Sequence, residues 1–349
     1  MNTSVFLHAA CDVRVASAPL REGREGEALI EVAAVGICGS DLHYYKDGGI
    51  GAAVIRAPFV PGHEFSGYLC DGAPTLRLGK GVLVAVDPNQ SCGVCDWCRA
   101  GHVNLCPNVR FIGAPPNDGA MTKRLWVPAS QIIPLPEEFG PIEAAMLEPL
   151  GVAIHTVDLA KPALLEKVTL LGAGPIGLLV LQALRAGGAG DVFVVDPLRH
   201  RRAAASRSGA TNVFACVEDA VREAGVSSLV VEATNSPDGF QDAAKCARIG
   251  GRVILAGIPD GDHYALTASE ARRRALKIKF VRRMGDDYPR AIQLVRDNRI
   301  DIVSLVSHHI GLEETPEAFA ALAEGRPDYH KVIIQPSMTA NAGLTIMES

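Results

Sequence analysis

The fold of this chain is decided by the stretch Val168-Thr-Leu-Leu171-Gly172-Ala-Gly174-Pro-Ile-Gly177-Leu-Leu-Val-Leu-Gln-Ala-Leu184. The apolar run before Gly172 is typical of a buried parallel strand, and the apolar run after Gly177 predicts a helix. Glycines spaced G-x-G-x-x-G between such a strand and helix form the turn that holds a dinucleotide pyrophosphate. This stretch therefore predicts a nucleotide-binding α/β domain.

Each position of the glycine turn has a physical task. Gly172 permits the tight turn, Gly174 lets the backbone approach the pyrophosphate, and Gly177 lets helix and strand pack closely. Pro175 and Ile176 begin the helix, whose free N–H groups favour an anion. We expect these residues to bind the cofactor: Gly172, Gly174, Pro175, Ile176 and Gly177.

Asp196 predicts the kind of dinucleotide. It ends the next predicted strand, nineteen positions after Gly177, where a carboxylate accepts hydrogen bonds from the ribose hydroxyls and repels a 2′-phosphate. NAD is therefore expected rather than NADP. Three nearby arginines would weaken that repulsion: Arg199, Arg201 and Arg202.

The flanking sequence predicts a chain of two parts. Apolar runs at 191–195, 228–231 and 252–255 alternate with helical stretches, which indicates a doubly wound parallel sheet of the Rossmann type over residues 153–285. Residues 1–152 form short β-rich runs bounded by glycine and proline. After residue 285 the alternation weakens to two predicted helices and a strand at 331–334.

Bulk composition excludes several classes of protein. The chain has 349 residues, enough for about two domains, and its net charge of −5 with dispersed basic residues argues against nucleic-acid or anionic-membrane partners. It shows neither a signal-peptide pattern nor a span of about 18 apolar residues. Its nine cysteines fit a reducing compartment, so we expect a soluble cytoplasmic protein.

Four cysteines predict a closed metal site. Their C-x2-C-x2-C-x7-C spacing lets the thiolates converge on one zinc ion and leaves no position for water, as in structural zinc sites. The cysteines are Cys92, Cys95, Cys98 and Cys106.

A second, incomplete ligand set lies upstream. Cys38 and His63 offer a thiolate and an imidazole, and a catalytic zinc needs about three protein ligands and one exchangeable position. Either Glu64 or the distant Glu148 would supply the third ligand. The sequence thus predicts an open zinc site besides the closed one.

The order of these motifs resembles the zinc-containing medium-chain dehydrogenase/reductase family over essentially the whole chain. Three stretches are similar to polyol dehydrogenases of the sorbitol and xylitol type: 39–45, 115–119 and 146–155. The resemblance implies a GroES-like catalytic domain split between residues 1–152 and 286–349. It also implies two zinc ions per subunit, one catalytic and one structural, and a homodimer or homotetramer.

The resemblance also implies roles for particular residues. Zinc would be held by Cys38, His63 and a carboxylate, in the polyol branch usually Glu64, while Glu148 contacts water or substrate.

The other implied roles concern the proton, the substrate and the cofactor. Ser40 and His43 would pass the proton to solvent. Tyr44, Ile50 and Phe111 would line the substrate pocket. The remaining contacts would come from Arg201, Gly257 and Ile258 to the cofactor, and from Arg282 to substrate or cofactor.

The expected activity is reversible oxidation of a secondary hydroxyl of a small polyol to a ketose, linked to NAD+. One alternative is an amino-alcohol enzyme of the threonine 3-dehydrogenase kind, and another is a non-catalytic, zinc-stabilised NAD-binding protein. Two positions depart from the sorbitol enzymes, Arg283 where an aromatic residue is common and Ala114 where threonine is common. Some animal sorbitol dehydrogenases also lack the four-cysteine lobe, which this chain retains.

Overall fold

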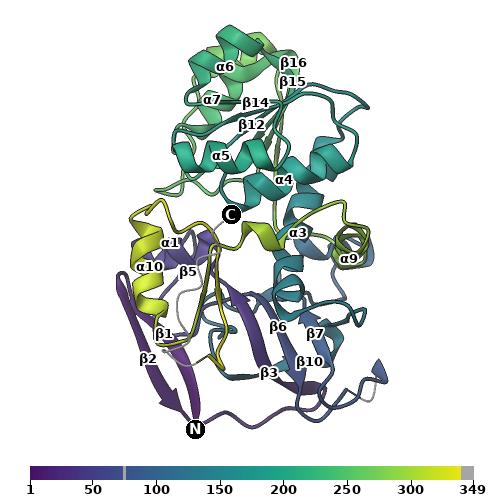
Figure 1. Ribbon diagram of the computed structural model, residues 1–349, viewed down its shortest axis with the longest axis vertical. Coiled ribbons are helices and arrows are strands. Elements are labelled where there is room, and N and C mark those ends of the chain that lie inside the picture. Colours follow the sequence, from purple (N-terminus) through teal and green to yellow (C-terminus); the bar gives the residue numbers. More distant parts are fainter. Residues whose placement is uncertain (74–75, 339–349) are drawn as a thin grey trace. The chain divides into compact units, whose positions relative to one another are not determined.

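The computed structural model describes residues 1–73 and 76–338, and the chain divides into two compact units (Figure 1). Unit 1 comprises residues 1–148 and the chain from residue 302 onward, and unit 2 comprises residues 149–301. The boundary at 285 suggested by the sequence falls before α9 (Tyr288–Arg296), which the contacts assign to unit 2. Arg290 of this helix pairs with Asp158 of the same unit, at 2.9 Å between Nη1 and Oδ1.

Unit 1 is built on a mixed sheet that has seven strands in the described residues. Its order is β11-β7-β6-β3-β19-β18, with β10 also paired to β3. The strands are β3 (Glu27–Gly36), β6 (Glu64–Leu69), β7 (Leu83–Val86), β10 (Arg124–Pro128), β11 (Ile132–Pro134), β18 (His308–Ile310) and β19 (Val332–Ile334).

The returning chain completes this sheet. Strand β19 lies antiparallel to β3, with Ile333 opposite Gly36, so residues almost 300 positions apart are neighbours. The core around them is apolar and closely packed, with Phe65 and Phe319 among its largest fully buried side chains. This pairing brings the segment around residue 331 beside the segment around residue 37.

Shorter elements surround the sheet of unit 1. Its two-stranded ribbons are β1 (Asn2–Ala9) with β2 (Asp12–Ala18), β4 (Gly49–Ile50) with β5 (Ala53–Val54), and β8 (Asn89–Gln90) with β9 (Arg110–Phe111). Its helices are α1 (Gly39–Asp47), α2 (Asp96–Arg99), the first part of α3 (Pro141–Ala160), α10 (Thr315–Ala323), and the 3-10 turns η2 (Val103–Leu105), η3 (Ala129–Gln131) and η4 (Val303–Leu305).

Unit 2 is a parallel sheet of six strands in the described residues, in the order β14-β13-β12-β15-β16-β17. The chain order reverses between β12 and β15, which is the topology of a doubly wound Rossmann sheet. The strands are β12 (Val168–Leu171), β13 (Val192–Val195), β14 (Asn212–Phe214), β15 (Ser227–Glu232), β16 (Ala247–Leu255) and β17 (Lys277–Phe280). The helices, besides α9, are α4 (Pro175–Ala186), α5 (Arg199–Arg207), α6 (Val217–Ala224), α7 (Gly239–Cys246) and α8 (Ala268–Arg274). The predicted α/β fold with a Rossmann domain is confirmed.

Candidate metal and cofactor sites

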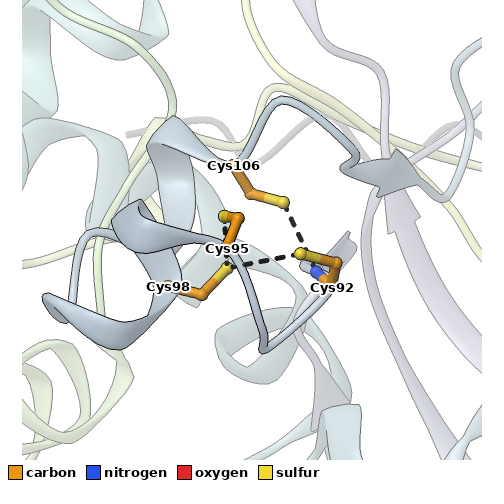
Figure 2. A group of neighbouring side chains, drawn as sticks. All are labelled: Cys92, Cys95, Cys98 and Cys106. Atoms are coloured by element: carbon orange, nitrogen blue, oxygen red, sulfur yellow. Dashed lines mark hydrogen bonds between the residues drawn. The ribbon is translucent and has the colours of Figure 1, made fainter.

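The four cysteines of the lobe converge as predicted. Figure 2 shows their side chains pointing toward a common centre, and all four sulfurs lie within 4.8 Å of one another. Cys95 and Cys98 Sγ are 3.4 Å apart, and Cys92 and Cys98 Sγ are 4.0 Å apart. A tetrahedral ion with arms of about 2.3 Å requires sulfur separations of about 3.8 Å. The residues therefore fit one zinc ion.

The backbone of the lobe favours the thiolate of Cys92, whereas burial and the neighbouring sulfurs raise the pKa of the Cys95 thiol to about 11. N–H groups of Val94 and Cys95 donate to the Cys92 sulfur and lower the pKa of this thiol to about 6. The N–H of Cys92 in turn points to Cys106 Sγ at 3.4 Å. Because zinc binds the thiolate form, this local support suits a closed structural site.

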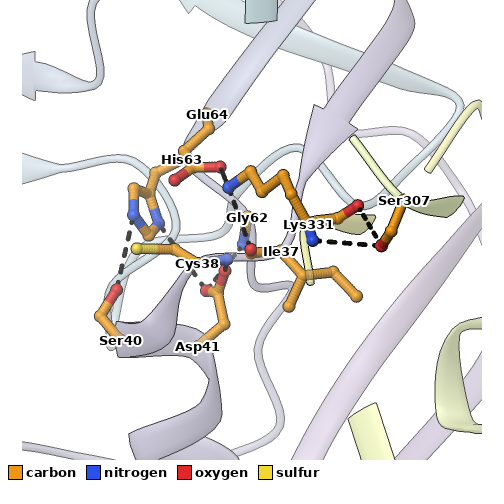
Figure 3. A network of polar contacts seen from close by, with 9 residues as sticks. All are labelled: Ile37, Cys38, Ser40, Asp41, Gly62, His63, Glu64, Ser307 and Lys331. Carbon is orange, nitrogen blue, oxygen red and sulfur yellow. Dashed lines mark hydrogen bonds and ion pairs between the residues drawn. The ribbon is translucent and has the colours of Figure 1, made fainter. Parts of the chain in front are cut away.

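The second ligand set forms a separate group in unit 1. Cys38, His63 and Glu64 each place a ligand atom within 4.8 Å of the others (Figure 3). His63 and Glu64 are buried, and His63 Nδ1 lies 3.7 Å from the Asp41 carboxylate, an ion-pair contact rather than a hydrogen bond. A thiol, an imidazole and a carboxylate that converge in this way are the donor types of a protein zinc site, so the three residues fit a metal ion.

Asp41 connects the two segments that supply these donors. This fully buried residue accepts the N–H of Cys38 at 3.0 Å, which caps the start of α1. Its other oxygen lies 3.4 Å from the N–H of Gly62, just before His63. Gly62 has a φ of 96°, a left-handed conformation that favours glycine. Asp41 therefore fixes the thiol and the imidazole relative to each other.

Lys331 is a member of the site that the sequence analysis missed. Its side chain is buried, and Nζ contacts Glu64 Oε2 and lies 3.1 Å from the carbonyl oxygen of Ile37 (Figure 3). Burial opposes its charge, but attraction to Glu64 and Cys38 outweighs burial and raises the pKa of Lys331. The pairing of β19 with β3 brings this lysine next to Glu64. No motif in the sequence around Lys331 therefore predicts that it belongs to the site.

Three acidic groups lie near the single ammonium group of Lys331: the Cys38 thiol and the carboxyl groups of Glu64 and Glu148. Burial, helped by the neighbouring Glu64 carboxylate, raises the pKa of the Cys38 thiol to about 12 and that of the Glu148 carboxyl to about 8. A divalent cation would favour the ionised form of each donor. Glu148 itself is buried but does not belong to the tight group of three.

Of the two predicted proton-relay residues, Ser40 contacts one of these donors. Ser40 Oγ is 3.5 Å from His63 Nε2. His43 is buried on α1, and its Nδ1 lies 3.3 Å from Asp47 Oδ2 one turn later in the same helix. The carboxylate orients the imidazole ring.

The predicted pocket residues are arranged in two ways. The ring of Phe111 lies 5.3 Å from that of His63, next to the donors. Tyr44 is buried edge-on against Phe59, at 5.7 Å between ring centres, and Ile50 packs against the same apolar cluster. The observed role of Tyr44 is therefore packing in this apolar cluster.

The glycine turn in unit 2 has the expected geometry. Gly172 has a φ of 92°, and a Cβ there would lie 2.7 Å from the carbonyl oxygen of Ala233. A Cβ at Gly177 would lie 2.1 Å from the carbonyl oxygen of Gly172, whereas one at Gly174 would meet nothing within 4 Å. Gly174 caps α4 and leaves open space at the helix N-terminus, where Pro175 and Ile176 begin the first turn. This arrangement fits a bound pyrophosphate.

Asp196 lies beside this turn at the end of β13. Its carboxylate accepts the N–H groups of Ala173 and Leu198, both at 2.9 Å, and Arg201 Nη1 lies 3.9 Å away. Asp196 therefore ties the glycine turn to the start of α5, next to a cationic side chain. The remaining predicted cofactor residues also follow strands at the carboxyl edge of this sheet: Gly257 and Ile258 after β16, and Arg282 after β17.

Comparison with known proteins agrees with these geometries. Residues 24–137 match the alcohol dehydrogenase GroES-like domain, and residues 175–297 match the zinc-binding dehydrogenase domain. The chain is 32% identical to the sorbitol dehydrogenase of Bacillus subtilis over 96% of its own length and 97% of that protein.

Solved structures of related proteins extend the likeness. An alcohol dehydrogenase of E. coli CFT073, solved with NADH, has a TM-score of 0.86 and 26% identity, covering 96% of this chain and 99% of its own. A zinc-binding dehydrogenase of Sinorhizobium meliloti 1021, solved with NADP, has a TM-score of 0.86 and 30% identity, with the same coverage of 96% and 99%.

The two domain types and the two zinc-ligand sets define a zinc-binding alcohol dehydrogenase. The chain belongs to the zinc-containing medium-chain dehydrogenase/reductase family, and within it to the polyol dehydrogenase branch. In the part of the chain that the structure describes, no helix combines the length and apolar character needed to span a bilayer.

Proposed function

We propose that this enzyme catalyses the reversible NAD+-linked oxidation of a secondary hydroxyl of a small polyol to a ketose. The observation that carries the proposal is the buried group of Cys38, His63 and Glu64 on the same chain as an intact dinucleotide turn. A zinc site without catalytic turnover needs no buried, partly open donor set. The likeness to a sorbitol dehydrogenase supports a polyol as the substrate.

In this proposal Cys38, His63 and Glu64 hold the catalytic zinc. Lys331 binds one oxygen of Glu64 and so orients the other toward the metal, as partners of metal-ligating carboxylates commonly do. Glu148 stays close by and contacts water or substrate. When bound, zinc supplies a Lewis acid that lowers the pKa of the substrate hydroxyl.

The chain's own residues move the proton and receive the substrate. Ser40, near His63, accepts the hydroxyl proton as it gives up its own proton toward His43, which passes a proton to solvent, with Asp47 orienting the His43 ring. Phe111, Tyr44 and Ile50 contribute the apolar surface of the substrate pocket, with Arg282 binding substrate or cofactor.

The proposed cofactor is NAD, bound by the glycine turn with Gly257, Ile258 and Arg201. The Asp196 carboxylate disfavours a 2′-phosphate, and Arg201 at 3.9 Å only partly offsets this repulsion. A cytoplasmic homodimer or homotetramer with two zinc ions per subunit completes the proposal. The nine unpaired cysteines among the described residues support a reducing compartment.

A substrate panel tests the proposal directly. Four- to six-carbon alditols and L-threonine are each assayed with NAD+ and NADP+ by absorbance of the reduced cofactor, before and after chelation. We expect alditol oxidation with NAD+ that chelation abolishes and zinc restores. Turnover of L-threonine alone, or full activity in protein whose single zinc lies in the cysteine lobe, would contradict it.

A further inference from the structure

A buried carboxyl group of unit 2 has no role in the chemistry described so far. Glu232 is the last residue of β15 and is 1% exposed. Its Oε1 accepts the N–H of Thr234 at 2.6 Å and the Thr234 hydroxyl at 2.5 Å. Its Oε2 is buried and has no hydrogen-bond partner of normal geometry within residues 1–73 and 76–338, but the backbone N–H of Gly257 faces the carboxyl group and favours its ionised form. Burying a carboxyl oxygen without a full hydrogen bond costs folding free energy, so we expect a function that requires Glu232 at this position.

Glu232 lies between two backbone segments, residues 233–236 and 256–258. Through Thr234, whose hydroxyl accepts the N–H of Ser236 at 3.1 Å, it holds the first segment. The second segment lies against its other oxygen, since a Cβ at Gly257 would come within 2.8 Å of Oε2. The same Cβ would lie 1.9 Å from the carbonyl oxygen of Thr234, so the two segments are in direct contact around the carboxyl group.

These segments border the place where a dinucleotide binds. The sheet order reverses between β12 and β15, and ligands of doubly wound sheets bind outside the carboxyl ends of the strands at this reversal. The glycine turn packs directly on the first segment, because a Cβ at Gly172 would lie 2.9 Å from Thr234 Cγ2. Thr234 and Gly257 therefore continue the surface that begins at the glycine turn.

We propose that Glu232 is a positioning residue for the dinucleotide, which fixes the Thr234 and Gly257 segments as the floor of the cofactor site. It touches no cofactor atom and acts through the backbone that it holds. The inference rests on the proposed cofactor site and adds a residue that lies outside the glycine turn and Asp196. Misplacement of about 1 Å in such supporting groups is enough to weaken a preorganised site.

The test measures NADH binding by fluorescence in the full-length protein with its zinc. Glu232→Ala removes both contacts, and we expect its Kd for NADH to rise about tenfold or more, as for other supporting residues. Glu232→Gln keeps the oxygen that accepts from Thr234 and has nearly the same shape as glutamate. We expect this variant to bind NADH within about threefold of the unaltered protein.

Glu166→Ala is the matched control. Glu166 is also a largely buried carboxylate of unit 2, paired with Arg252 and bonded to Ser228, but it precedes β12 at the opposite edge of the sheet. Its loss should lower the melting temperature without changing the Kd for NADH. This comparison separates positioning from general destabilisation, because a merely structural Glu232 would behave like Glu166.

Unchanged NADH affinity in folded Glu232→Ala would overturn the inference, and so would equal weakening in the Ala and Gln variants. If Glu232→Ala does not fold, Thr234→Val replaces it in the test. A rise in the Kd for NADH of about threefold or more would support the positioning role of Glu232, and an unchanged Kd would refute it. The readout requires no polyol. Failure of the alditol assay with normal NADH binding would therefore contradict the proposed function alone.

Discussion

The two metal sites of unit 1 are built in opposite ways. The cysteine lobe draws all four donors from one short stretch, 92–106, and its own backbone N–H groups stabilise the thiolate of Cys92. The open site collects Cys38, His63 and Glu64 from two segments, and its counter-charge comes from Lys331, far along the chain. A closed site can thus be locally self-sufficient, whereas an open one depends on distant side chains.

Cys38→Ser should give the largest effect. Loss of the thiolate at the open site should reduce turnover at least about 10³-fold, because several kcal/mol of charge stabilisation are removed. Steady-state kinetics measure the loss, and calorimetry with NADH titration should give near-normal folding and cofactor binding. If Cys38→Ser lowered the melting temperature as much as loss of a cysteine of the lobe, the two sites would not have separate catalytic and structural roles.

Cys98→Ser should affect folding instead. Without one of its four thiolates the lobe loses its zinc, and we expect the melting temperature to fall by at least about 5 °C. Zinc analysis should show one ion fewer per subunit. At a temperature where the variant is folded, the kcat per remaining open-site zinc should stay close to normal; a 10³-fold loss there would contradict the structural assignment.

Lys331→Met tests the dependence on a distant residue. Without the Lys331 ammonium, the Glu64 carboxylate loses the partner that orients it, and zinc affinity at the open site should fall about 10- to 100-fold. Competition with a chromogenic chelator measures this affinity, and a parallel titration of a variant that lacks the cysteine-lobe zinc separates the two sites. Lys331→Arg is the matched control, since it keeps the charge; equal loss in both variants would show that the charge itself is unimportant.

Asp41→Asn should have the smallest effect. The amide keeps one acceptor but loses the other, so either the cap of Cys38 or the contact to Gly62 is removed. A lost hydrogen bond of about 1 kcal/mol corresponds to about fivefold weaker zinc binding at the open site. The same chelator competition detects it, and zinc in the cysteine lobe should be unchanged.

The sequence predicted best those features whose residues are adjacent in the chain. The glycine turn, the strand at 168–171 and the convergence of the four cysteines all follow from short spacings. Lys331 was missed because its position depends on strand pairing across the sheet. Strand β17 was missed too, since its alternation of exposed lysines with Ile278 and Phe280 lacks the continuous apolar run of its neighbours.

The pairing of β19 with β3 has a consequence for biosynthesis. The cysteine lobe can take up zinc as soon as residues 92–106 have been translated. Glu64, in contrast, meets its ammonium partner only after 267 further residues, once the whole of unit 2 has been made. Because domains fold in the order in which they emerge from the ribosome, we expect the cysteine lobe to acquire its zinc early and the open site to be completed last.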